Sequence, residues 1–179
     1  MATLNEIKTR INAVKNTQKI TRAMKMVAAS KLRRAQDKII STRPYAYKMS
    51  ELLNHLISVA DVSLNPLMQE REIKKRLVIV MSSDRGLCGA FNANIIKYTV
   101  KYLNETGKDT PLITVGKKVN DYFSKRKYNV IKSHINFFSD LNIEASNEIT
   151  AFLINGYLEN QFDSVEIIYN EFKSVMKQT

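Results

Sequence analysis

The 179-residue sequence contains no Trp, one Cys, three Pro and five Gly. A single Cys cannot form an internal disulfide, so a disulfide-stabilised fold is excluded and a reducing compartment fits. No apolar run approaches the roughly 20 residues of a membrane-spanning helix. His, Cys and carboxylate residues do not occur at metal-ligand spacing, and the carboxylates form no obvious catalytic pair. We therefore expect no metal, no cofactor and no independent enzyme.

The first 42 residues contain neither Gly nor Pro and are rich in residues that favour helices. Apolar residues recur there at three- and four-residue steps, which is typical of one helix face. The face starts at Leu4, weakens over residues 17–21 and resumes at Met24. Its narrow width allows either a helix that lies on its own domain or one strand of a coiled coil.

Positive charge is concentrated in residues 1–48. These residues hold seven Lys and five Arg against Glu6 and Asp37, a net charge of +10 out of +11 for the whole chain. The remaining residues are nearly neutral. A helix with this charge is expected to bind a nucleic acid, an anionic membrane or an acidic protein surface.

The chain changes character after this basic segment. Arg43-Pro44 predicts a kink or break, after which helical periodicity resumes as far as Ala60. Residues 61–76 are predicted to be a linker, with the charged run 69–76 forming a solvated loop. We therefore expect a long basic helix over residues 1–60 and a separate domain over residues 77–179.

Strands and helices alternate in the second part. Strands are predicted over 77–81, 110–115, 129–132 and 164–169, and helices over 90–103, 117–125 and 143–160. The last helix is expected to bury Ile149, Phe152, Leu153 and Leu158. This alternation predicts an α/β fold with right-handed crossovers, in which helices cover both faces of a Rossmann-like parallel sheet.

The loop over residues 84–89 lies where a Rossmann-type phosphate loop would lie. It has only two glycines and neither directly follows the strand, so a tight turn with unusual glycine backbone angles is favoured over a nucleotide site. Cys88 lies near Arg85 and could be reactive. No His is close in sequence, so a buried or half-buried structural thiol is favoured.

Two segments resemble one known family. Residues 20–36, ITRAMKMVAASKLRRAQ, are similar to the amino-terminal helix of the gamma subunit of F-type ATP synthases. Residues 83–92, SDRGLCGAFN, are similar to the other strongly marked segment of that family. The resemblance runs through all 179 residues. The family continues beyond this point and ends in a second long helix, antiparallel to the first, which we expect this chain to lack.

The resemblance implies a non-catalytic subunit that forms the central shaft of a rotary ATP synthase. Such a shaft couples ion flow through the membrane rotor ring, the c ring, to conformational cycling of the catalytic beta subunits. The implied partners are the alpha, beta and epsilon subunits and the c ring, at the cytoplasmic face of a bacterial plasma membrane. The alternative is a nucleic-acid-binding module that uses the basic helix. Against it, the helix has no aromatic residue before Tyr45 for stacking on bases.

Three sets of residues are implied to make contacts in that role. The ring bearing or the paired helix would be contacted by Leu4, Ile7, Ile11, Val14, Met24 and Leu32. Acidic loops of the beta subunits would be contacted by Arg22, Lys25, Lys31, Arg33 and Arg34. The lower ends of the ring subunits would be contacted by a loop containing Asp84, Arg85, Gly86, Cys88 and Gly89, for which a purely structural turn is an equal alternative. Without its companion helix, the isolated chain is expected to self-associate or to lose order at its amino end.

Overall fold

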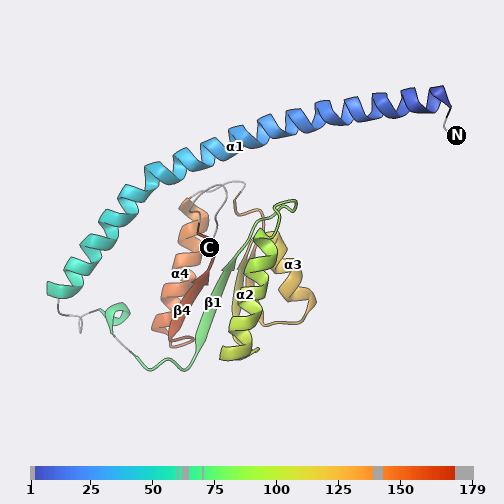
Figure 1. Cartoon of the computed structure of the whole chain (residues 1–179). Helices are drawn as coiled ribbons and strands as arrows, with labels where there is room; N and C mark the ends of the chain where they lie inside the picture. Colours follow the sequence, from blue (N-terminus) through green and yellow to red (C-terminus); the bar gives the residue numbers. More distant parts are fainter. Residues whose placement is uncertain (1–2, 60, 62–64, 70, 139–142, 172–179) are drawn as a thin grey trace. The chain divides into compact units, whose positions relative to one another are not determined.

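The computed structural model describes residues 3–59, 61, 65–69, 71–138 and 143–171. The chain divides into two compact units, residues 1–61 and residues 62–179. The first unit is a long helix and the second is an α/β domain (Figure 1).

The first unit consists of α1, Leu4–Val59, a single helix of 56 residues. At a rise of 1.5 Å per residue it is about 84 Å long. Its first turn is closed by a capping box: the Thr3 backbone N–H donates to Glu6 Oε2 at 3.0 Å, and the Glu6 N–H donates to Thr3 Oγ1 at 3.4 Å. This reciprocal pair explains why the helix begins at Leu4.

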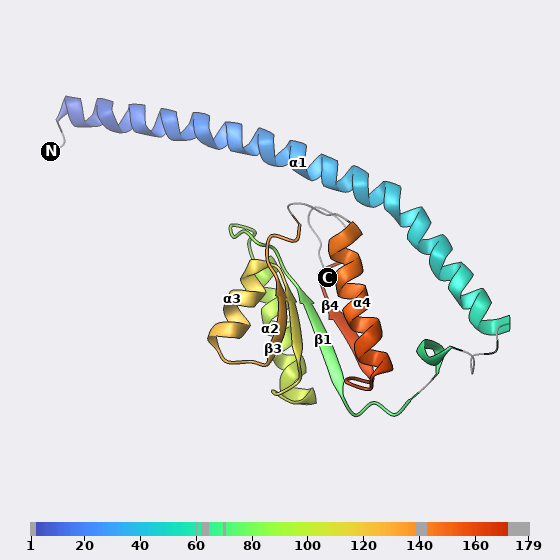
Figure 2. The same ribbon diagram turned by 180° about the vertical axis from the view of Figure 1, so that it is seen from behind.

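The helix is not broken at Pro44, which lies inside it. The ribbon curves gradually, without a sharp corner (Figures 1 and 2). Proline removes one backbone donor and crowds the preceding turn. Residues 40–44 are exposed, so water can satisfy the carbonyl that loses its partner. The Thr42 hydroxyl also donates to the Lys38 carbonyl oxygen at 2.8 Å on the preceding turn. The expected break at this position is therefore wrong.

The second unit is built on a four-stranded sheet. Its strands are β1 Arg76–Met81, β2 Leu112–Val115, β3 Val130–His134 and β4 Ser164–Ile168. They pair in the order β3-β2-β1-β4, and every pair is parallel. The predicted parallel sheet is therefore confirmed. The carboxyl ends of all four strands meet at one edge, where the 84–89 loop lies.

Helices cover both faces of the sheet. They are α2 Phe91–Thr106, α3 Lys117–Lys125 and α4 Ile143–Leu158. Val78 and Val80 of β1 pack with residues of α2 and α3, whereas Leu77 and Ile79 pack with residues of α4. The alternation along β1 thus divides the core into two layers, as expected for a strand buried on both sides.

The buried side of α4 differs in part from the expectation. Phe152 and Leu153 pack against the core, and Ile149 is half-buried. Leu158 is 44% exposed, so its predicted burial is wrong. Gly156, two residues earlier, is buried against the ring of Phe162. Leu158 is the last residue of α4.

The segment between the two units is partly attached to the second. It contains the short 3-10 helix η2, Pro66–Met68. Arg71 Nη1 donates to the Tyr157 carbonyl oxygen and to Asn160 Oδ1, both at 3.0 Å, and its guanidinium stacks on the Tyr157 ring at 3.8 Å. Arg71 is therefore held against α4, whereas residues 72–75 are exposed and irregular, as predicted for a solvated loop.

Candidate functional site

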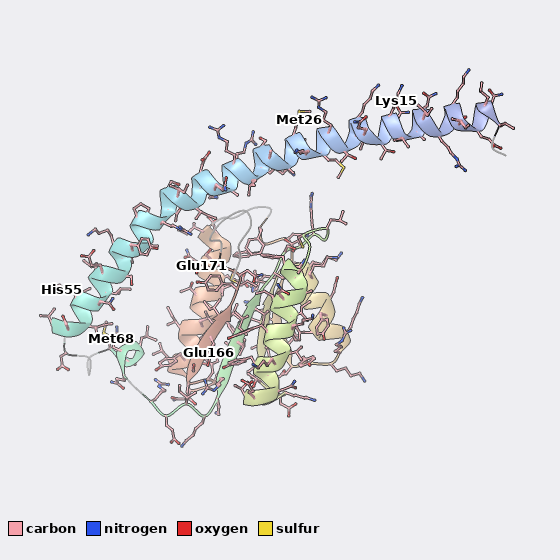
Figure 3. All side chains as sticks on the ribbon, viewed as in Figure 1. Lys15, Met26, His55, Met68, Glu166 and Glu171 are labelled. Atoms are coloured by element: carbon pink, nitrogen blue, oxygen red, sulfur yellow. The ribbon has the colours of Figure 1, made fainter. Side chains whose placement is uncertain are left out.

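The apolar residues predicted for the helix surface are all exposed on α1. Leu4, Ile7, Ile11 and Val14 follow a 3.5-residue repeat, and the same repeat reaches Leu32. We call this line of residues the seam. Met24 lies one position before the seam, and Lys25 lies in it. The structure therefore places five of the six predicted apolar residues on one line and leaves Met24 beside it. Side chains project from α1 on all sides (Figure 3).

The predicted basic residues of α1 are also exposed. Within residues 4–59, Lys48 and Glu51 form an ion pair at 2.7 Å. Arg22, Lys25 and Lys31 form no ion pair within the described part of the helix, nor do Arg33 and Arg34. The positive charge of these five residues is therefore not neutralised by ion pairs within α1 and is available to an acidic partner.

Asp84 holds the loop after β1 against two other elements. Its Oδ1 accepts hydrogen bonds from the Lys117 backbone N–H at 2.9 Å and from the Asn136 backbone N–H at 2.8 Å. Lys117 begins α3, and Asn136 follows β3. A carboxylate at a helix amino terminus is favoured by the orphan N–H groups there. Asp84 therefore has a positioning role that joins three segments at the carboxyl edge of the sheet.

Neighbouring serines complete the contact with α3. Ser82 Oγ accepts from the Val119 N–H at 3.1 Å, and the Ser83 carbonyl oxygen accepts from the Lys118 N–H at 3.3 Å. Together with the bond to Asp84, these contacts satisfy the first three N–H groups of α3. A phosphate would need such groups free. The start of α3 therefore offers no free N–H group among these three to a phosphate.

Asn92 closes the 84–89 loop from inside. Its Oδ1 accepts from the Ser83 N–H at 3.1 Å, and its Nδ2 donates to the Arg85 carbonyl oxygen at 3.3 Å and to Cys88 Sγ at 3.0 Å. Cys88 is nevertheless exposed, so its predicted burial is wrong. The thiol is held by a hydrogen bond at the surface, because the loop turns outward before α2 begins.

The backbone angles of the loop differ from the expectation at one glycine. Gly89 has φ +57°, as predicted for a glycine in a tight turn. Gly86 does not have a positive φ; Leu87 has φ +61° in its place. Glycine patterning pointed to the turn but could not show which residue takes the left-handed conformation.

A groove of about 510 Å³ lies between α2 and β4, which is one of the two edge strands of the described sheet. Its polar groups are bonded to one another: the Tyr102 hydroxyl donates to Glu166, and Arg76 Nη1 lies 2.5 Å from Glu166 Oε1. Burial, followed by the bond to Glu166, raises the pKa of Tyr102. The bond to Glu166 also raises the pKa of Arg76. The raised pKa values keep the Tyr102 hydroxyl and the Arg76 guanidinium protonated at neutral pH.

Among the described residues, no group of three or more His, Cys, Asp and Glu side chains could hold a metal ion. None of the described helices combines the length and apolar character needed to cross a membrane.

The sequence matches the family model described as ATP synthase over residues 3–179. It is 49% identical to the ATP synthase gamma chain of Chloroherpeton thalassium, in an alignment that covers 98% of this chain and 60% of that relative. It is 46% identical to the gamma chain of Geotalea uraniireducens, covering 99% of this chain and 63% of the relative. The chain thus spans about three fifths of the length of these curated relatives.

The structure is similar to known rotor subunits. One is a chain of the Tetrahymena thermophila mitochondrial ATP synthase, from a structure of its central stalk and c-ring, with a TM-score of 0.70 and 27% identity over 89% of this chain and 69% of that chain. Another is a chain of the Euglena gracilis mitochondrial ATP synthase rotor, with a TM-score of 0.59 and 21% identity. That alignment covers 96% of this chain and 58% of the Euglena chain, and it supports the fold. On its sequence and its fold, this chain belongs to the ATP synthase gamma-chain family.

Proposed function

We propose that this chain supplies the amino-terminal helix and the globular domain of the central shaft of a rotary ATP synthase. In this role it performs no chemistry. It transmits rotation between an ion-driven membrane ring and the catalytic beta subunits. The observation that carries the proposal is a helix of 56 residues without a buried side chain, in a chain of the gamma family.

The exposed seam supports a role that needs other polypeptides. Fully burying a Leu, Ile or Val side chain contributes about 1.5–3 kcal/mol. Leu4 and Val14 are 70% and 67% exposed, so each stands to gain roughly half that amount or more when covered. An apolar contact without directional hydrogen bonds also allows sliding, because no single angle of rotation is held by specific bonds.

The basic residues of α1 support contact with acidic loops of the beta subunits. Exposed ion pairs contribute only about 0–1 kcal/mol each. Arg22, Lys25, Lys31, Arg33 and Arg34 would therefore steer and align the shaft without locking it. The same charge would suit a nucleic acid, but the gamma-chain relatives favour the shaft over that alternative.

The further partners in this proposal are the alpha subunits, the epsilon subunit and the c ring. Relatives from bacteria support a position at the cytoplasmic face of the plasma membrane, peripheral to it. The 84–89 loop would meet the lower ends of the ring subunits.

The proposal is tested by binding to a purified alpha–beta ring from the Chloroherpeton thalassium enzyme. The carboxy-terminal remainder of that organism's gamma chain is added as a separate peptide to cover the seam. We expect the full chain to bind the ring, and the double variant R33E/R34E to bind at least tenfold more weakly at low salt. The matched control K108E/K125E reverses two exposed charges in the second unit and should bind within twofold of the parent.

Failure of the parent chain to bind the ring with the peptide present would refute the shaft role. Binding to duplex DNA that falls steeply with salt, together with indifference to the ring, would favour the nucleic-acid alternative.

A further inference from the structure

We propose that the crevice between the carboxyl ends of β1 and β4 is a binding site for a small, uncharged aromatic molecule that carries a ring N–H donor. The site lies entirely within the second unit. Its ligand is additional to the protein partners of the shaft, so the site goes beyond the proposed function and does not depend on it.

The order of the strands creates this crevice. β1 lies between β2 and β4, so the chain leaves β1 toward one side and later returns to its other side as β4. α2 and α3 pack on one face of the sheet and α4 packs on the other. The position between β1 and β4 is therefore a topological switch point (Figure 1). Open α/β sheets bind ligands at such points, outside the carboxyl ends of the strands.

A cavity of about 330 Å³ lies at this point. Its walls come from the ends of four elements. They include Met81 and Ser83 at and after the end of β1, Tyr169 and Asn170 after β4, Phe91 at the start of α2, and Phe138 after β3. The volume is at the small end of the roughly 300–1,000 Å³ that is typical of small-molecule sites. It therefore suits one ring or two fused rings.

The walls favour an uncharged aromatic ligand. Phe91, Phe138 and Tyr169 contribute rings, and Met81 contributes a thioether, which also packs well against aromatic rings. None of the lining residues that the structure describes is charged. A phosphate or another anion would therefore find no cation in this part of the lining.

Asn170 supplies an open hydrogen-bond acceptor. Its Nδ2 donates to the Phe91 carbonyl oxygen at 3.2 Å. Because a carbonyl oxygen can only accept, this bond fixes which end of the amide carries the hydrogens. Asn170 Oδ1 accepts no hydrogen bond from any residue that the structure describes, whereas the hydroxyls of Ser82 and Ser83 are already bonded. A ligand N–H is the group that complements this acceptor.

The larger groove between α2 and β4 is a different cavity and a weaker candidate. It shares Tyr169 and Asn170 with the switch-point cavity. The side chains of Tyr102 and Glu166 in that groove are bonded to each other. Tyr98 lines the groove and not the switch-point cavity, so it distinguishes the two in an experiment.

Indole is a suitable probe, because it has two fused rings and one N–H donor. The chain contains no Trp, so the fluorescence of indole can be measured without an intrinsic indole background. We expect indole to bind the full chain with a Kd on the order of 1 mM, as for a ligand of few atoms. Benzofuran has the same shape but an oxygen in place of the N–H, and it should compete about fivefold more weakly.

Three variants locate the bound probe. N170A should weaken indole binding about fivefold and leave benzofuran binding nearly unchanged, because only indole uses the acceptor. F138A removes part of a wall and should weaken both probes by about threefold or more, with little change in the urea midpoint because Phe138 is 43% exposed. The matched control Y98A alters an aromatic residue that is 61% exposed in the larger groove, and it should change indole affinity by less than about twofold.

The absence of saturable indole binding to the parent chain would overturn this site. Equal binding by the parent, N170A and F138A would also overturn it, as would binding that is lost in Y98A and kept in F138A. Displacement of indole by the carboxy-terminal peptide of the Chloroherpeton thalassium gamma chain would show that the cavity serves a contact within a longer chain, and would equally overturn the small-molecule site. None of these measurements uses the alpha–beta ring, so their failure leaves the proposed function standing.

Discussion

The sharpest prediction concerns Gly116, which lies between β2 and α3 and touches the start of the 84–89 loop. Its φ of +102° is open to glycine but strained for alanine. A Cβ there would lie 2.1 Å from the Ser82 carbonyl oxygen and 2.8 Å from the Ser82 carbonyl carbon. Ser82 is 3% exposed and is bonded to α3, so it cannot move aside without disturbing that helix.

The cost of G116A has two parts. Backbone strain of this kind costs about 1–3 kcal/mol. Overpacking against buried backbone costs about another 1–3 kcal/mol. A total of roughly 2–6 kcal/mol, with a middle value near 4 kcal/mol, is a large fraction of the 5–15 kcal/mol that stabilises a typical domain. With a urea dependence of about 2 kcal/mol per molar, the unfolding midpoint should fall by roughly 2 M.

Two other glycines serve as matched controls near the same edge of the sheet. Gly89 has φ +57° but nothing within 4 Å of an added Cβ, so G89A carries strain alone and should cost about 1 kcal/mol. Gly86 has an ordinary φ, and its added Cβ would lie 3.7 Å from the end of the Lys118 side chain. G86A should therefore change stability by no more than about 0.5 kcal/mol.

The assay is urea unfolding of the full chain followed by near-ultraviolet circular dichroism. Six of the eight tyrosines lie in the second unit and there is no tryptophan, so this signal reports mainly on the α/β domain. The urea midpoint is expected to be highest for G86A, lower for G89A and lowest for G116A. A G116A midpoint equal to that of G89A would refute the clash with Ser82.

Three further predictions concern the α/β unit. Burial, with a smaller effect of Lys132, lowers the pKa of His134. Below about pH 6.5 the unfolded chain binds a proton that the folded chain resists, so the urea midpoint should be lower at pH 5.5 than at pH 7.5. H134N should reduce this dependence of the midpoint on pH. The backbone N–H groups of Lys75 and Lys74 lower the pKa of Asp163. D163N should therefore lower the urea midpoint at neutral pH. The difference between D163N and the parent should shrink as the pH falls through the lowered pKa of Asp163. An added Cβ at Gly156 would lie 2.4 Å from the Phe162 ring. G156A should therefore lower the free energy of unfolding by about 1–3 kcal/mol in the same assay. An unchanged urea midpoint would contradict the packing described for α4.

Local signals predicted much of the second unit. The apolar run before Met81 predicted β1, and the helix over Lys117–Lys125 was predicted with its observed bounds. The end of α2 was missed by three residues. The helix continues to Thr106 because Gly107, at φ +120°, ends it by donating its N–H to the Leu103 carbonyl oxygen.

Other features depended on context that a local pattern does not contain. Arg43-Pro44 predicted a kink or break, but an exposed helix can lose one hydrogen bond to water and continue unbroken. Cys88 was expected to be buried, but the loop that carries it turns outward. Leu87 gave no signal in the sequence, because a left-handed leucine cannot be recognised from residue type.

The sequence by itself determined the long amphipathic helix, the placement of charge on it, the alternation of strands and helices, and the family. These properties are encoded in periodicity and in residues that are close along the chain. Only the tertiary structure decided the strand order, the role of Asp84 and the constraint on Gly116. Asp84 meets partners 33 and 52 residues away, and Gly116 meets Ser82 from a different strand. Such contacts arise when the sheet brings its carboxyl ends together, and no spacing within a single element specifies them.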